Sequence, residues 1–173
     1  MKPTLGVIEA FAMVAGAIAL AFAGNVAAAD GSAKGTLTYK SNAGAFTMTP
    51  KYAYLVKGPD AVDNTKIVRH LILSSTDLGA KIQACKTMSC TDADLNNGMT
   101  VDLDAGPRLN YWVVLNNQRV QYSGTEPPAS LTLTADTPTR LAGTLVFDGT
   151  AAGGPQVNVE FDAPMLMELK LAR

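Results

Sequence analysis

The chain has 173 residues, and its 14 Lys and Arg against 15 Asp and Glu give a formal net charge of −1 at pH 7. Charges of both signs are scattered along the sequence, so it lacks the clustered basic residues that bind nucleic acid or an anionic membrane. The single histidine excludes a multi-histidine metal site. We therefore expect no nucleic-acid partner.

Residues 1–29 have the pattern of a secretory signal peptide. Lys2 gives a positive start, residues 10–24 are almost wholly apolar, and the small residues 26–29 end the segment with an A-x-A pattern. The apolar run is short for a membrane span, which needs roughly 20 residues, and Glu9 interrupts any longer run. We expect no membrane span in the mature chain.

Cleavage is expected after Ala29, which leaves residues 30–173 as one domain. A chain of this length can bury roughly 68–70% of the surface that its unfolded form exposes, so it needs no metal to hold a core. The short signal, the few cysteines and the Ala-rich composition are typical of bacterial exported proteins. The predicted location is therefore the periplasm first and secretion beyond it second.

The mature chain consists of short segments with strand patterns, separated by turns. Alternating apolar and polar residues or dense apolar runs predict about ten strands, over residues 35–40, 45–49, 51–57, 67–73, 99–103, 109–115, 119–122, 131–135, 141–147, 157–161 and 166–171. The turn residues 41–44 make the first two strands a predicted hairpin. Residues 124–128 are predicted to be a loop, and Pro164 is expected to interrupt the chain between the last two strands.

One short helix is predicted near residues 77–85, because Leu78, Ile82 and Cys85 fall on one helical face. Many short strands with turn signals every 8–12 residues or so favour an all-β fold. We predict a single antiparallel β-sandwich, immunoglobulin-like or jelly-roll-like, over residues 30–173. A closed all-antiparallel sheet is the weaker alternative.

Cys85 and Cys90 are the only cysteines, and an even count in an exported protein predicts a disulfide. The bridge would enclose four residues, so it should stabilise the fold by less than the ~3 kcal/mol of a 15-residue loop. Its expected role is to hold a local turn. Two free thiols or a metal pair are the alternatives, although two sulfurs without a nearby histidine do not make a zinc site.

Asp92, Asp94 and Asn96 are candidate calcium ligands, because oxygen ligands at alternate positions are similar to the start of an EF-hand loop. The match fails at two places: Gly98 comes one position late, and Leu103 stands where a bidentate Glu belongs. The simpler interpretation is a turn, which Asp and Asn build by bonding their own backbone. Calcium is the one cofactor that we consider, and otherwise none is expected.

Candidate catalytic groups are few. His70 lies in an apolar strand pattern, where a lone histidine is usually structural, and the nucleophile motif G-x-S-x-G does not occur. Asp102 with Asp104, and Glu160 with Asp162, have the i, i+2 spacing that separates carboxylates by roughly 6.5–7 Å along a strand, as in a glycosidase pair. Solvent-facing strands show the same spacing by default. We therefore expect that the protein is not an enzyme.

Tyr52 and Tyr54 share one face of the predicted strand 51–57. If that face is exposed, the pair is a candidate binding patch, because aromatic residues are enriched at interfaces. If that face is buried, the two tyrosines are ordinary core residues. The sequence alone leaves both interpretations open.

These observations predict an exported, non-catalytic binding or interaction module of the bacterial cell envelope, whose partner is an envelope protein or a glycan. The alternative is a structural or assembly component that pairs with a partner chain through an edge strand. The third hypothesis is a glycan hydrolase that uses one of the paired carboxylates. No residue motif identifies a known family.

Overall fold

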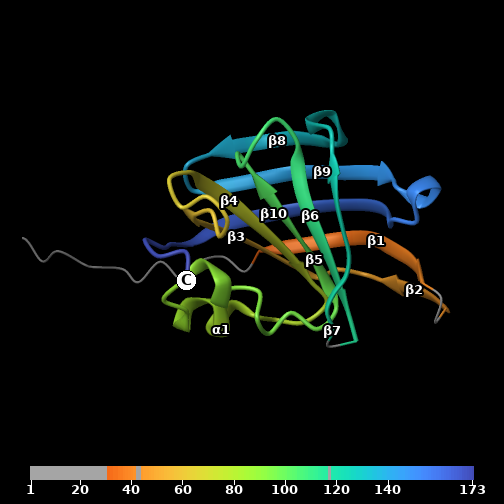
Figure 1. The fold of residues 1–173 in the computed structure, drawn as a ribbon, viewed down its shortest axis with the longest axis horizontal. Coiled ribbons are helices and arrows are strands. Elements are labelled where there is room, and N and C mark those ends of the chain that lie inside the picture. Colours follow the sequence, from red (N-terminus) through yellow and green to blue (C-terminus); the bar gives the residue numbers. More distant parts are fainter. Residues whose placement is uncertain (1–30, 42–43, 117) are drawn as a thin grey trace, which may run out of the picture.

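The computed structural model describes residues 31–41, 44–116 and 118–173 (Figure 1). The predicted signal peptide, residues 1–29, lies outside these residues. The described chain forms ten strands: β1 Ser32–Ser41, β2 Gly44–Met48, β3 Tyr52–Pro59, β4 Ile67–Ser74, β5 Gly98–Leu103, β6 Leu109–Leu115, β7 Gln118–Glu126, β8 Leu131–Thr137, β9 Arg140–Asp148 and β10 Gln156–Glu168. It also contains one α-helix and three 3-10 helices: α1 Gly79–Ala84, η1 Met88–Cys90, η2 Pro128–Ser130 and η3 Thr150–Ala152.

The strands form one curled mixed sheet, which confirms the predicted all-β class. Its order is β2-β1-β10-β3-β4-β5-β6-β7, while β9 also pairs with β10 and β8 pairs with β9. Figure 1 shows β8, β9 and β1 running across the view, whereas β4, β5 and β6 cross them at a steep angle. The sheet therefore curls so that its two halves face each other.

β10 joins the two halves. Residues 156–164 pair antiparallel with β9, and residues 156–162 pair antiparallel with β1 on the other side. Residues 165–168 then pair in parallel with residues 55–57 of β3. The prediction of purely antiparallel pairing is wrong at this pair. Two separate sheets, as in a sandwich, are not confirmed, because β10 connects both halves through hydrogen bonds.

Pro164 does not end the strand, contrary to the sequence prediction. It lies opposite Arg140 as the last residue of β10 that pairs with β9, and the chain continues extended to Glu168. Proline has no N–H to donate to a ladder, so it fits where a strand exchanges its partners. The next residue, Met165, donates its N–H to the carbonyl oxygen of Thr139 at 2.8 Å and begins the pairing with β3.

Most predicted strands are confirmed, and the first two form the expected hairpin. The predicted loop over residues 124–128 is wrong at its start, because β7 continues to Glu126 opposite Leu109. The predicted helix is confirmed as the short α1. Among the described residues, no helix is long and apolar enough to cross a membrane.

The apolar residues form two clusters on opposite faces of β3 and β4. The first cluster lies inside the curl and draws on both halves of the sheet, through residues such as Leu37, Leu55, Leu71, Leu145 and Phe161. The second lies on the outer face, where the segment after β4 and the C-terminal segment pack onto the sheet, and includes Val56, Ile72, Ile82, Met88 and Leu169. Because both faces of β3 and β4 are covered, six of the eight residues in each of these strands are buried.

Gly35 is a glycine that the β1–β10 pairing requires. Its φ is +118°, and a Cβ there would lie 2.1 Å from the carbonyl oxygen of Asn158. Gly35→Ala should therefore lower the free energy of unfolding by about 2 kcal/mol or more, measured by urea unfolding. Gly106→Ala is the control, because a Cβ there meets nothing within 4 Å and should change stability by no more than about 0.5 kcal/mol. Equal stabilities of the two variants would contradict the conclusion that position 35 requires glycine.

Candidate functional site

A buried histidine–aspartate pair lies on the outer face of the sheet. The antiparallel register of β4 and β5 places His70 directly opposite Asp102. The His70 Nδ1 and an Asp102 carboxylate oxygen are 2.5 Å apart, and only 8% of the His70 surface is exposed. His70 shares this face with Val68 and Ile72, because side chains alternate between faces along a strand. The pair is thus surrounded by apolar residues.

The charges near His70 favour its protonated form. Burial lowers the pKa of His70, whereas the hydrogen bond and charge of Asp102 and the charge of Asp92 raise it, and the net shift is upward. A raised pKa means that the imidazolium forms at a higher pH than in an exposed histidine. At weakly acidic pH both ring nitrogens then carry a proton, and only Nδ1 is used by Asp102.

Two polar atoms on this face are buried without a hydrogen-bond partner in the described part of the chain: His70 Nε2 and Thr100 Oγ1. Thr100 lies two residues before Asp102 on β5 and therefore on the same face. An unpaired buried polar atom costs about 1–3 kcal/mol.

A pocket of about 270 Å³ opens above this pair, and we call it the His70 pocket. Its floor is built by three adjacent strands, through His70 of β4, Asp102 of β5 and Trp112 of β6. Ser89 of η1 and the following Asp92 form one wall. Apolar residues complete the lining: Pro59, Ala61, Val68, Met88 and Val114.

Trp112 is half-buried and Ser89 is exposed, so the pocket has an aromatic side and an open mouth. Asp92 is half-buried, and its carboxylate has no hydrogen bond or ion pair with any of the described residues. No Lys or Arg belongs to the residues that line the pocket. Among the residues that line the pocket, His70 is therefore the one that can carry a positive charge.

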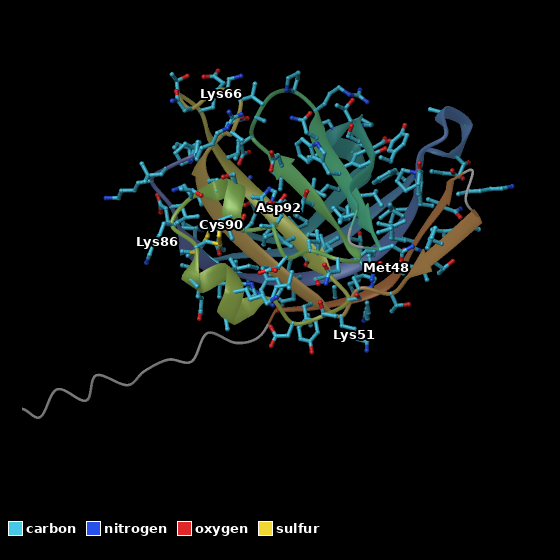
Figure 2. The ribbon with its side chains drawn as sticks, turned by 60° about the horizontal axis from the view of Figure 1, so that its bottom comes forward. Met48, Lys51, Lys66, Lys86, Cys90 and Asp92 are labelled. Atoms are coloured by element: carbon cyan, nitrogen blue, oxygen red, sulfur yellow. A yellow bond between two sulfur atoms is a disulfide. The ribbon has the colours of Figure 1, made fainter. Side chains whose placement is uncertain are left out.

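The wall that carries Ser89 and Asp92 is tied down covalently and by the C-terminal segment. Cys85 and Cys90 form the predicted disulfide, with their Cα atoms 5.6 Å apart. The backbone N–H of Ser89 donates to the carbonyl oxygen of Ala172 at 3.1 Å. Figure 2 shows Cys90 at the disulfide, with Asp92 nearer to the strands. The disulfide thus holds a short segment that shapes the pocket.

The predicted calcium ligands do not come together. Asp92 lines the His70 pocket, whereas Asp94 lies outside it and pairs with Lys81, with Nζ and Oδ1 3.2 Å apart. Asn96 is exposed. Among the described residues, no three His, Cys, Asp or Glu side chains gather as a metal-binding group. Of the three candidates, the structure therefore brings one to the pocket.

Tyr52 and Tyr54 lie beneath α1 and outside the lining of the His70 pocket. Their rings stack with centroids 6.4 Å apart, and Tyr54 is 3% exposed. The Tyr54 hydroxyl donates to Asp77 at 2.7 Å and accepts the Leu78 N–H at 2.8 Å, while burial and the neighbouring Asp77 raise its pKa. Tyr54 therefore connects β3 to the start of α1, and a binding role for the pair stays a prediction.

The carboxylates considered for hydrolysis do not face each other as free pairs. Asp104 adopts a φ of +72° just after β5 ends, and its carboxylate turns to Arg69. Each of the four acids instead has its own basic partner: Asp102 with His70, Asp104 with Arg69, Glu160 with Lys34, and Asp162 with Arg140. The acid that does lie near Asp102 at the pocket is Asp92.

Sequence reasoning did not assemble this site. The sequence predicts a structural role for His70 and pairs Asp102 with Asp104, and within the predicted strand 109–115 it does not single out Trp112. The available signal was a polar residue within each of two consecutive apolar strand patterns, at 67–73 and 99–103. Recognising the pair requires the register between β4 and β5, which alternation alone does not give.

Comparison with known proteins adds no further information about this site. No protein-family model matches the chain, and no curated protein or solved structure matches it. The function must therefore be inferred from the chemistry of the His70 pocket.

The single histidine makes the His70–Asp102 pair directly measurable. Nuclear magnetic resonance titration should give a His70 pKa above the usual value of about 6.5, and Asp102→Asn should lower that pKa because burial then dominates. Asp104→Asn, which removes the partner of Arg69, should leave the pKa unchanged. A wild-type pKa below about 6.5 would contradict the pairing.

The same pair gives stability a defined pH dependence. Because the folded-state pKa of His70 is raised, its contribution to the free energy of unfolding is complete below about pH 6.5. The contribution is lost as the pH rises through the folded-state pKa of His70.

Removing the disulfide should increase the local mobility of the pocket wall and have only a small effect on the stability of the whole fold. The double variant Cys85→Ser, Cys90→Ser should lower the free energy of unfolding by less than about 3 kcal/mol, because the closed loop is short. Hydrogen exchange should accelerate in residues 86–92 and stay unchanged in β4 and β5. Unchanged exchange over 86–92 would show that the tail contacts hold the wall without the disulfide.

Proposed function

We propose that the protein is a non-catalytic binding module of the bacterial cell envelope that takes one unit of a glycan into the His70 pocket. The observation that carries this proposal is the position of Trp112 in the same pocket as Asp92, Asp102 and His70. One aromatic side chain beside several hydrogen-bonding groups matches the two kinds of surface that a sugar ring offers.

The chemistry of recognition follows from those two surfaces. A sugar ring has an apolar face of C–H groups, which can pack against the flat surface of Trp112. Its edge carries hydroxyl groups, which can donate to the Asp92 carboxylate in charge-assisted hydrogen bonds.

The size and placement of the pocket support a small unit of a longer chain. Its volume of about 270 Å³ lies just below the range of roughly 300–1,000 Å³ found for drug-sized ligands. Exposed Ser89 lies at the mouth, so further units of a glycan could continue along the surface. A single buried ring with an exposed continuation is therefore the best fit.

The proposal also places the protein outside the cytoplasm, in the periplasm or secreted beyond it. It is supported by the signal-peptide pattern of residues 1–29 and by the Cys85–Cys90 disulfide, because disulfides persist mainly in oxidising compartments. The same oxidising environment would keep the wall of the His70 pocket in place.

Trp112 is the only tryptophan, so its fluorescence reports directly on the His70 pocket. Titration with neutral and amino monosaccharides and with envelope glycan fragments should give a saturable change in emission for at least one of them. Trp112→Ala should weaken that ligand at least about 10-fold in calorimetry, because central aromatic anchors dominate binding energy.

Tyr52→Ala is the matched aromatic control, because Tyr52 is half-buried and lies outside the pocket lining. This variant should bind as the wild type does. Loss of binding in Tyr52→Ala with retention in Trp112→Ala would move the site to the tyrosine face of β3. No emission change with any saccharide, combined with self-association, would instead favour assembly through an edge strand such as β8.

A further inference from the structure

The charge balance of the His70 pocket indicates which glycan unit fits. Two carboxylates, Asp92 and Asp102, line the pocket, and neither Lys nor Arg does. Asp102 is already bonded to His70, whereas the Asp92 carboxylate has no partner in the described chain. A half-buried carboxylate without a partner gains most from a ligand that brings its own cation.

His70 leaves one of the two carboxylates for a ligand. Its Nδ1 is hydrogen-bonded to Asp102, so Asp102 already has a partner. The other ring nitrogen, Nε2, is closed to a water-sized group, so a ligand in the pocket meets Asp92 and Trp112 instead. The pocket thus offers a ligand one charged group and one aromatic surface.

A simple cation would satisfy only part of this arrangement. An ammonium ion could pair with Asp92, but it has no ring for Trp112. A neutral sugar could pack on Trp112 and donate a hydroxyl to Asp92, but it leaves the Asp92 charge uncompensated. A sugar ring that carries an amino group satisfies both residues.

We propose that the His70 pocket selects an amino sugar with a free amino group, whose ammonium pairs with Asp92 and whose ring packs on Trp112. This inference rests on the proposed glycan-binding function and narrows the class of ligand. It distinguishes the pocket from a general sugar site, because acetylation of the amino group removes the charge that Asp92 recognises.

The test compares glucosamine, N-acetylglucosamine and glucose by calorimetry and by Trp112 fluorescence. Wild-type protein should bind glucosamine at least about tenfold more tightly than the other two, which corresponds to ~1.4 kcal/mol. Asp92→Asn keeps the shape of the side chain and removes its charge, so it should reduce this preference to less than about twofold.

Asp94→Asn is the matched control. Asp94 belongs to the same segment, but it pairs with Lys81 outside the pocket, so the variant should keep the full preference for glucosamine. The preference should also fall when the salt concentration is raised, because ion pairs near the surface are screened.

The outcomes separate this inference from the function on which it rests. Saccharide binding with equal or tighter affinity for glucose or N-acetylglucosamine would overturn the amino-sugar inference and leave glycan binding intact. A glucosamine preference that survives in Asp92→Asn would also overturn it. Failure of all saccharides to bind, with Asp92→Asn and wild type alike in stability, would overturn the proposed function and this inference together.

Discussion

The architecture depends on β10 belonging to both halves of the sheet. Residues 156–164 lie between β1 and β9, and residues 165–168 lie beside β3. One strand therefore fixes the angle and register between a half that contains strands from both ends of the chain (β1, β2, β8 and β9) and a half from its middle (β3–β7). The last residues, 169–173, leave β10 on the outer face, where their backbone accepts hydrogen bonds from η1. The position of β10 thus also determines one wall of the His70 pocket.

The His70–Asp102 pair is poorly explained as a device for stability. A buried ion pair loses hydration, and its replacement by well-packed apolar residues is often neutral or stabilising by about 1–4 kcal/mol. The neighbouring positions on the same face, Val68 and Ile72, show that apolar side chains fit there. The unpaired Nε2 adds a further cost. Two unfavourable features beside one pocket are more consistent with recognition of a ligand than with packing.

Alternation along the chain predicted the strands well because it is a local property. Residues 109–113 alternate between buried and half-buried in β6, and the half-buried Trp112 lines the pocket. The error at Pro164 has a tertiary cause. A proline ends a strand only where the neighbouring strand needs a hydrogen bond from the missing N–H. Pro164 lies where β10 changes from β9 to β3 as its neighbour. The parallel pairing of β10 with β3 is equally non-local, so no pattern within either segment could reveal it.

The site was predictable only in fragments for the same reason. Asp92 was selected for its spacing to Asp94 and Asn96, yet the spacing is not what the structure uses. Lys81 on α1 draws Asp94 away, while the disulfide and η1 direct Asp92 toward the strands. The chemistry was therefore carried by residues far apart in sequence, which only the register of β4, β5 and β6 brings together.

Few contacts within the pocket wall itself hold its conformation. Ligand binding in the pocket therefore depends on the oxidation of Cys85 and Cys90 to a disulfide. Residues 86–92 contain one short 3-10 helix, and their conformation relies on the Cys85–Cys90 bridge and on the tail that ends at Arg173. Arg173 also reaches the opposite side, where its guanidinium donates to the Ala61 carbonyl oxygen at 3.0 Å. A wall held in its binding geometry before the ligand arrives avoids the entropy cost of ordering it afterwards. In the proposed function, affinity therefore depends on a bond that forms only after export.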